Sequence, residues 1–178
     1  HSTAPIPGVE IYHGRLQLMT DQVQLFFGEV PHDLEEFSFA SQCVQAEALK
    51  FFIELFRGGR DGSQWRKSGI VWWNLRDGWP QISDAVVDYY FEKKLAFDYV
   101  RKAQSPVLLV LREAAGWSQD LVVCNDTRDT VSLRYSVQDI DSGEVLAEGK
   151  INAKGDEVTL ITSIKSFSSQ QRLLRLQW

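Results

Sequence analysis

The sequence has little sulfur and few histidines, and this limits the chemistry it can carry. Its 178 residues include two cysteines, one methionine and three histidines. Cys43 lies in a helical pattern and Cys124 in a strand pattern, with no CxxC motif, so we interpret both as free buried thiols. The histidines at positions 1, 13 and 32 are scattered and no HExxH motif occurs. We therefore expect no metal site and no cofactor.

Long apolar runs and an excess of positive charge are also lacking. Without a run of about 18 apolar residues, no membrane span is predicted. The net charge of −5 argues against nucleic acid as a partner, because proteins that bind nucleic acids usually carry a basic face. The opening residues, HSTAPIPGVE, contain neither an initiator methionine nor a signal-like apolar core. We therefore expect a chain processed or excised from a longer polypeptide, and its compartment stays open.

Aromatic residues, by contrast, are plentiful. They make up 12% of the chain and include six tryptophans, in a composition that is otherwise typical of one or two folded domains. Three of these tryptophans, Trp72, Trp73 and Trp79, fall within one short stretch together with Asn74 and Asp77. Such a stretch is either core packing or a flat aromatic floor with polar groups around it, which is how a sugar is held.

Helical patterns dominate the first part of the chain. The clearest helix is predicted over 33–57, where Asp33 and Glu36 resemble a capping box and Gly58 and Gly59 follow the end. A shorter helical piece is plausible around 21–27, and another helix is predicted over 92–104. The longest helix carries a stripe of apolar residues at helical spacing: Val44, Ala48, Phe51, Phe52, Leu55 and Phe56.

One strand is predicted between the two longer helices, over 69–75. Its nearly continuous apolar run fits a strand buried on both faces, with Trp72 and Trp73 pointing in opposite directions. Lys93 and Lys94, further on, are expected on a solvated face. A single strand of the parallel type, with only two helices beside it, cannot have both of its faces buried within this part of the chain. This part therefore pairs with other protein or is the end of a β/α barrel.

After Pro106 the pattern changes to short strands separated by turns. Alternating apolar and polar residues predict an antiparallel sandwich, and a sandwich of this type usually has about seven strands. We thus predict an α+β chain with one part at 1–104 and a β-sandwich at 105–178 that lacks its last strand. The expected strands are Val107–Leu111, Leu121–Cys124, Val131–Val137, Glu144–Ile151, Glu157–Ile161 and Leu173–Trp178.

Several short motifs between residues 33 and 106 resemble glycoside hydrolase family 2, in its β-mannosidase-like and β-galactosidase-like branch. Over 107–178 the resemblance is only architectural. In that family an aromatic-Trp-Gln-Leu-Asn-Asp-x-Trp-Pro motif lies on the last barrel strand, before the final barrel helix and an immunoglobulin-like sandwich. The matching residues here are Trp72-Trp73-Asn74-Leu75, Asp77-Gly78-Trp79-Pro80, Asp88-Tyr89-Tyr90, Lys94-Leu95-Ala96, Ser41-Gln42 and Gln45-Ala46-Glu47-Ala48.

The resemblance implies the C-terminal fragment of a (β/α)8 barrel followed by an immunoglobulin-like sandwich. It implies a retaining glycosidase that acts on β-linked sugars, with a carbohydrate substrate and the remainder of the parent enzyme as partners. Both catalytic glutamates are expected upstream of this chain, so no catalytic residue is assigned here and the chain alone is expected to be inactive. Glu29 is a tempting substitute, but it lacks the residues that flank the family's nucleophile.

The resemblance also implies a sugar subsite at Trp73, Asn74, Asp77 and Trp79. Trp73 matches the tryptophan that forms the floor of the subsite, whereas Trp72 is expected to pack under a helix. Asp77 either accepts a sugar hydroxyl or orients the catalytic groups, or else only makes a turn with the following glycine. Trp79 either touches the sugar or holds the loop in shape.

Two departures from the family motif bear on the substrate. Asn74 stands where the family often has glutamine, and Arg76 where it often has asparagine. Arg76 could approach an acidic sugar or pair with Asp77.

A non-catalytic sandwich that binds carbohydrate or another protein is the alternative function. Trp117 and Trp178 could then form a sugar-binding surface, although single aromatic residues in a sandwich are usually core, which is what we expect of both.

Overall fold

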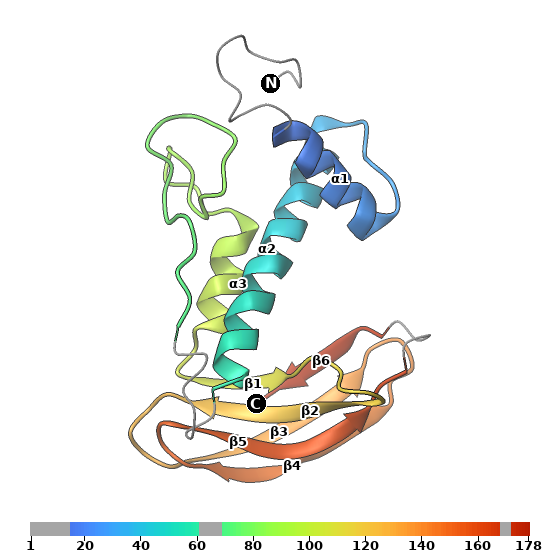
Figure 1. Ribbon diagram of the computed structural model, residues 1–178, viewed down its shortest axis with the longest axis vertical. Helices are drawn as coiled ribbons and strands as arrows, with labels where there is room; N and C mark the ends of the chain where they lie inside the picture. Colours follow the sequence, from blue (N-terminus) through green and yellow to red (C-terminus); the bar gives the residue numbers. More distant parts are fainter. Residues whose placement is uncertain (1–14, 61–68, 168–171) are drawn as a thin grey trace. The chain divides into compact units, whose positions relative to one another are not determined.

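The computed structural model describes residues 15–60, 69–167 and 172–178 (Figure 1). These residues form two compact units. The helical unit contains 15–50 and 72–100, and the sandwich unit contains 51–60, 69–71, 101–167 and 172–178. The boundary between the units runs through two helices, and the predicted division after residue 104 stays a prediction. Within the described ranges no helix is long and apolar enough to span a membrane.

The described residues form three helices, and each overlaps a predicted one. They are α1 (Arg15–Phe27), α2 (Leu34–Gly58) and α3 (Leu95–Ala103). The Asp33 carboxylate accepts hydrogen bonds from the backbone N–H groups of Glu35 at 2.9 Å and Glu36 at 3.1 Å, so it caps α2 as expected. Helix α3 begins later than predicted because Lys94 N donates to the Val86 carbonyl instead of opening the helix.

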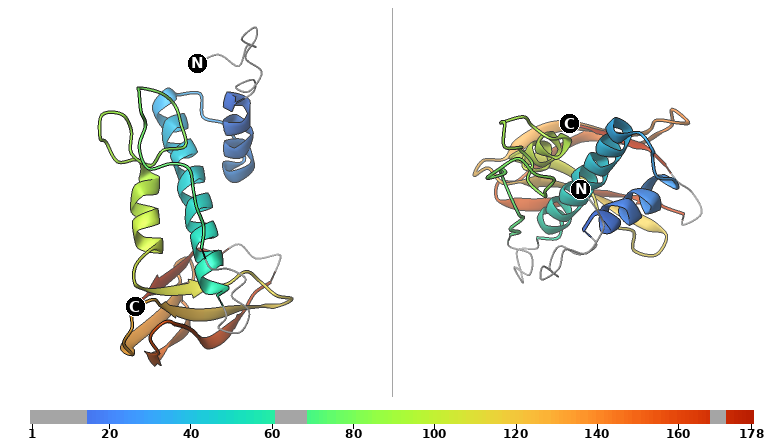
Figure 2. Two further views of the ribbon diagram at one scale, coloured as in Figure 1. Left: turned by 60° about the vertical axis from the view of Figure 1, so that its left-hand side comes forward. Right: turned by 90° about the horizontal axis from the view of Figure 1, so that it is seen from above.

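The buried face of α2 differs from the predicted stripe. In the helical unit Ala46 is fully buried and packs with Val86 and with Ala96 of α3, where α2 and α3 run side by side (Figure 2). Phe51 and Phe52, which the stripe placed inward, are exposed. Because α2 is apolar on more than one side, periodicity alone could not identify which side meets the core, and small alanines allow the closer approach.

The strand predicted over 69–75 is wrong as secondary structure. These residues are extended but belong to no strand, and only Arg76 forms an isolated parallel bridge, with Val87. A strand needs a partner along its length, and the described residues supply one only from Asn74 onward. Burial on both faces is also wrong, since Val71 is 100% exposed.

All six strands predicted after Pro106 are confirmed, and several are longer than expected. They form two antiparallel sheets in the orders β1-β2-β5 and β4-β3-β6, which appear as two layers in Figure 1. Both sheets contribute to one core, which includes Leu109 and Leu121 from the first and Val137 from the second. The strands are β1 (Val107–Leu111), β2 (Ser118–Asn125), β3 (Val131–Asp139), β4 (Val145–Ala153), β5 (Glu157–Lys165) and β6 (Leu174–Gln177).

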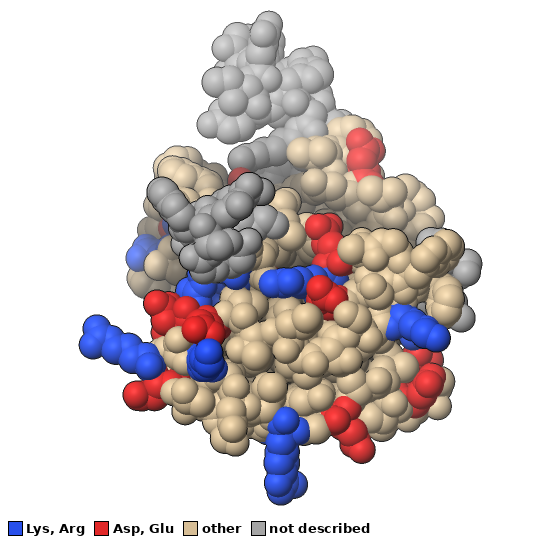
Figure 3. Space-filling model, turned by 60° about the horizontal axis from the view of Figure 1, so that its bottom comes forward, with Lys and Arg blue, Asp and Glu red and all other residues tan. Residues whose placement is uncertain are grey.

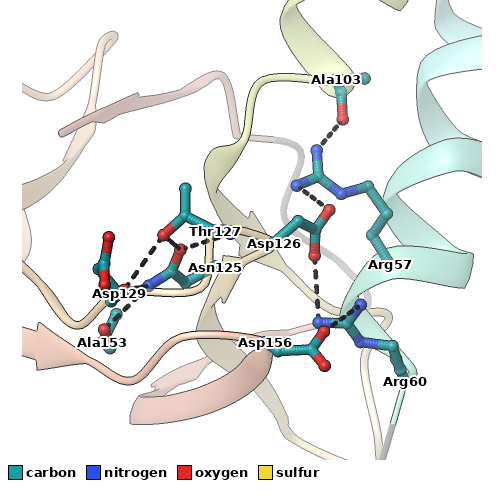
Figure 4. A network of polar contacts seen from close by, with 9 residues as sticks. All are labelled: Arg57, Arg60, Ala103, Asn125, Asp126, Thr127, Asp129, Ala153 and Asp156. Carbon is teal, nitrogen blue, oxygen red and sulfur yellow. Dashed lines mark hydrogen bonds and ion pairs between the residues drawn. The ribbon is translucent and has the colours of Figure 1, made fainter.

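Two arginines at the end of α2 hold the loops of the sandwich unit (Figure 4). Arg57 Nη2 lies 2.8 Å and Arg60 Nη2 3.1 Å from the carboxylate oxygens of Asp126, and Arg57 Nη1 donates to the Ala103 carbonyl at 2.5 Å. The side chain of Arg57 is mostly buried, whereas that of Asp126 is 38% exposed, so this contact is only partly shielded from solvent. The end of α2 is therefore part of the sandwich unit rather than an independent helix tip.

Next to this contact, Asn125 is fully buried and fully paired. Its Nδ2 donates to the carbonyls of Asp129 at 2.9 Å and Ala153 at 3.0 Å, and its Oδ1 accepts from the backbone N–H and the hydroxyl of Thr127 (Figure 4). The β2–β3 turn is thereby fixed by one amide.

The cysteines and tryptophans of the sandwich unit bear on two predictions. Cys43 and Cys124 are free, as expected; Cys124 is buried, and burial raises its pKa to about 11, while Cys43 of the helical unit is only half-buried. The prediction that Trp117 and Trp178 are core is wrong for both. Trp117 is 70% exposed, and its ring centroid lies 6.5 Å from that of Phe167. Trp178 is also exposed, although its indole N–H donates to the Val107 carbonyl at 3.0 Å.

The charges on the sandwich unit are mixed. On the face drawn in Figure 3, acidic and basic side chains alternate over a largely uncharged surface, and neither sign gathers into one large field. A surface of this kind offers no strong attraction to a polyanion on the face shown.

Candidate functional site

The predicted sugar-binding residues all lie in the helical unit, on the segment that leads from 72 to 79. Along 70–75 the side chains alternate between half-buried and exposed, as expected for an extended chain with one covered face. Trp72 packs against the cluster of Ala46, Val86 and Ala96, as predicted, whereas Trp73 points the other way and is 77% exposed. The two neighbouring tryptophans thus have different roles: one holds the segment to the helices and one presents its indole to the surroundings.

Asn74 follows Trp73 through a cis peptide bond. The Asn74 carbonyl accepts a hydrogen bond from Val86 N at 3.2 Å, which fixes its backbone. Its side-chain Oδ1 is buried but accepts no hydrogen bond from any residue in the described ranges. Buried acceptors are nearly always paired, so this oxygen is available for a donor from outside these residues.

Asp77 is fully buried, and its carboxylate is occupied. Oδ1 accepts from Gln81 Nε2 at 3.0 Å and from the Ser83 hydroxyl, and Oδ2 lies 3.3 Å from Lys94 Nζ. Burial pushes the pKa of Asp77 upward, but the hydrogen bonds from Ser83 and Gln81 and the charge of Lys94 outweigh it, so the pKa lies below its ordinary value. Asp77 is therefore an ionised group enclosed by its own loop.

Lys94 was predicted on a solvated face, and this is wrong. Its side chain is 18% exposed, and Nζ bridges the Asp77 carboxylate and the Ser83 carbonyl at 3.2 Å. The expectation failed because the partner of Lys94 is distant in sequence, and periodicity does not report such pairs. A usable signal was present all the same: a carboxylate that becomes enclosed in a loop requires a nearby cation, and Arg76, Lys93 and Lys94 are cations of the same unit.

Arg76 does not pair with Asp77, one of the two roles considered for it, and its approach to an acidic sugar stays a prediction. Its guanidinium lies 3.9 Å from the centroid of the Phe91 ring, a cation–π contact, and Asp77 pairs with Lys94 instead. Trp79 is exposed, so burial of its indole is not what holds the loop. Pairing with Asp77 is thereby excluded for Arg76, and Trp79 joins Trp73 as a second exposed indole.

The exposed indoles and the amide of Asn74 are groups that can hold a polar ring. An exposed indole face packs against the C–H face of a pyranose, and an unpaired amide oxygen accepts from a hydroxyl. Asp77 is committed to its loop, and Glu29 is an exposed residue after α1. Within the described ranges no group of three or more His, Cys, Asp or Glu side chains could hold a metal ion.

Comparison with known proteins connects this site to one group of enzymes. The sequence is 39% identical over 89 residues to β-mannosidase B of Aspergillus terreus, covering 48% of this chain, and 32% identical over 125 residues to β-mannosidase B of Aspergillus niger, covering 68%. The chain spans only 10% and 14% of these two relatives. No family model matches the sequence.

Solved structures show the same fold. The β-D-mannosidase of Dictyoglomus thermophilum superposes with a TM-score of 0.74 at 21% identity, over 88% of this chain and 20% of that one. The exo-chitosanase CsxA of Amycolatopsis orientalis, solved with PNP-β-D-glucosamine, gives a TM-score of 0.66 at 18% identity, over 92% of this chain and 19% of that one. The mixed helical and antiparallel architecture is thus that of glycosidases of this type. The predicted resemblance to the C-terminal part of a β-mannosidase-like enzyme of glycoside hydrolase family 2 is confirmed.

Proposed function

We propose that this chain is part of a β-glycoside hydrolase and supplies one wall of its sugar subsite. The proposal rests on two neighbouring residues. Trp73 exposes its indole, and Asn74 has a buried side-chain oxygen that accepts no hydrogen bond from the described residues. Trp79 adds a second exposed indole, and Asp77 of the same segment is an ionised, fully bonded carboxylate. An apolar face with hydrogen-bonding groups at its edge is the arrangement that binds a pyranose.

A β-linked mannoside is the substrate that we propose first. Two relatives more than 30% identical to this chain are named β-mannosidase B, and a solved neighbour is a β-D-mannosidase. Hydrolysis with retention requires two carboxyl groups about 5–5.5 Å apart. We propose that both come from the remainder of the parent polypeptide, because the carboxylate of this site, Asp77, is already paired.

The rest of the architecture follows from the same proposal. We propose that the extended segment 69–75 takes the place of the last strand of a (β/α)8 barrel and gains its strand partners from the parent polypeptide. In this proposal α3 is the final helix of the barrel and 105–178 is an immunoglobulin-like sandwich. The exposed apolar side chains of Val71, Trp73 and Leu75 support this assignment, since they form the row that neighbouring barrel strands and a bound sugar would cover.

A panel of nitrophenyl glycosides tests this function with the full-length polypeptide that carries the chain. The expected result is fastest hydrolysis of the β-mannoside, with β-glucosaminide as the comparison substrate, and a first product that keeps the β configuration. Failure to hydrolyse any β-glycoside would contradict the proposal. An α-configured first product would contradict retention alone.

The alternative is a sandwich that binds carbohydrate without catalysis. The observation that favours it is the exposed Trp117, next to Phe167. It predicts that oligosaccharide binding by the full-length protein, followed by calorimetry, is abolished by Trp117→Ala and unaffected by Trp73→Ala. The opposite pattern supports the subsite in the helical unit.

A further inference from the structure

The carboxylate of Asp77 holds together the loop that carries Trp79. Asp77 opens the loop, and its Oδ1 accepts from Gln81 Nε2 at 3.0 Å and from the hydroxyl of Ser83. The Ser83 hydroxyl oxygen in turn accepts from Ala85 N at 3.1 Å. The loop is therefore closed around a fully buried charge rather than around an apolar residue.

Lys94 connects this loop to the helices. Its Nζ lies 3.3 Å from Asp77 Oδ2 and 3.2 Å from the Ser83 carbonyl oxygen, and its backbone N–H donates to the Val86 carbonyl at 2.9 Å. The next residue, Leu95, donates its N–H to Gln42 Oε1 of α2 at 2.9 Å. One lysine thus ties the loop to the start of α3 and, through its neighbour, to α2.

Backbone hydrogen bonds next to this ion pair also fix the residues that face the proposed sugar. Val86 N donates to the carbonyl of Asn74, Val87 N to that of Leu75, and Asp77 N to that of Val87. Asn74 and the adjacent Trp73 are therefore attached to the far end of the loop that Asp77 and Lys94 close. A shift of about 1 Å in groups that hold a substrate can lower the rate about a hundredfold.

We propose that Asp77 and Lys94 form a buried ion pair that positions Trp73, Asn74 and Trp79 for sugar binding without either charge touching the sugar. This inference rests on the proposed function. It assigns a role to Lys94, which the sequence pattern placed in solvent, and it decides between the roles considered for Asp77. Because both side chains are enclosed, removal of either charge leaves the other buried and unpaired.

The test is a double-mutant cycle in the full-length enzyme with p-nitrophenyl β-mannoside as substrate. Its variants are Asp77→Asn, Lys94→Met and the double variant, with kcat and KM determined separately. Each single change is expected to lower kcat/KM about tenfold to a hundredfold, mainly through KM, because the displaced groups hold the sugar. The double variant is expected to lose no more than the worse single variant, because both act through one pair.

Lys93→Met is the matched control. Lys93 is exposed and lies 4.8 Å from the centroid of the Phe97 ring, so its kinetics are expected to stay within twofold of wild type. An unpaired buried charge can prevent folding. A further variant, Lys94→Arg, keeps the charge and therefore tests the proposal even if the other variants do not fold. It is expected to raise KM severalfold, less than Lys94→Met, at a melting temperature close to that of wild type.

Two different results separate this inference from the proposed function. A wild-type enzyme without activity on β-glycosides would overturn the function and the inference together. An active wild type whose Lys94→Met and Lys94→Arg variants keep the wild-type KM, or single effects that simply multiply in the double variant, would overturn the inference and leave the function standing.

Discussion

The sandwich unit and the helical unit bury their apolar residues to very different extents. In the sandwich unit two sheets enclose one core in which Leu121, Val123 and Val137 are fully buried. The helical unit has a buried cluster of only Ala46, Val86 and Ala96, surrounded by half-buried side chains. Large apolar side chains are exposed in both units, and those of the helical unit include Leu18, Leu25, Phe26, Phe27, Leu34, Phe39, Trp73, Leu75, Trp79, Ile82, Tyr89, Tyr90 and Phe91.

Exposed apolar surface of that extent marks a contact with other protein or a ligand. The sandwich unit also exposes apolar side chains, such as Val71, Trp117 and Leu160, but its two sheets enclose one continuous core. Our proposal that the helical unit is the end of a barrel predicts that the rest of the parent enzyme covers its exposed apolar side chains.

The largest effect on stability is expected from truncation in the sandwich core. Leu121→Ala removes a fully buried side chain and should lower the free energy of unfolding of the 178-residue chain by about 3 kcal/mol. Leu25→Ala, at a position 88% exposed in α1, should change it by less than about 0.5 kcal/mol. Urea unfolding of both variants measures the contrast, and equal losses would show that the helical unit is packed as tightly as the sandwich.

A second pair compares two asparagines. Asn125→Ala in the sandwich unit leaves the carbonyls of Asp129 and Ala153 without their donor and should cost about 2–3 kcal/mol. Asn74→Ala removes an oxygen that has no partner in the described ranges, so it should cost less than about 1 kcal/mol. The same urea experiment compares them, and a large loss for Asn74→Ala would mean that its side chain stabilises the fold rather than awaiting a ligand.

The stability of the helical unit should change in acid, and that of the sandwich unit should change in alkali. The pKa of Asp77 is lowered in the folded chain, so its ionised carboxylate stabilises the fold. This contribution is complete above pH values of about 3.9, the ordinary pKa of an aspartate, and is lost as the pH falls below that value. Cys124 has its pKa raised to about 11, so its contribution is complete at neutral pH and is lost as the pH rises from about 8.5 toward 11.

Melting temperatures measured from pH 2 to pH 11 test both expected directions of the change in stability. The difference between wild type and Asp77→Asn should be largest above pH 4 or so and shrink in acid. The stability of Cys124→Ala relative to wild type should rise in alkali, by roughly 2–3 kcal/mol at pH 11 for a shift of this size. Differences that do not change with pH would refute the assigned causes.

The sandwich was predictable because its signals are local. Alternation along Val131–Asp139 and turn residues between strands determine both the strands and the face they bury. The segment 69–75 was less predictable, since a strand is defined by its neighbours and an apolar run does not say whether the chain contains them. The period of two in this segment was still predicted correctly, because Trp72 and Trp73 point in opposite directions.

The polar frame of the site could not be predicted in the same way. Lys94 reaches Asp77 across a loop, and no spacing rule connects them. On α2 the stripe containing Phe51 and Phe52 was chosen as the buried face for its size, while Ala46 makes the close contact. Long-range pairing and the choice between two apolar faces are decided by tertiary structure, and there the sequence pattern was insufficient.

Two exposed tryptophans, one in each unit, provide the most direct test of the central claim. In the full-length polypeptide, Trp73→Ala should lower kcat/KM for p-nitrophenyl β-mannoside roughly tenfold to a thousandfold, because its indole holds the sugar. Trp117→Ala, which removes an equally exposed indole from the sandwich unit, should leave kcat/KM within about twofold. Wild-type kcat/KM for Trp73→Ala would contradict the claim that the helical unit forms a wall of the sugar subsite.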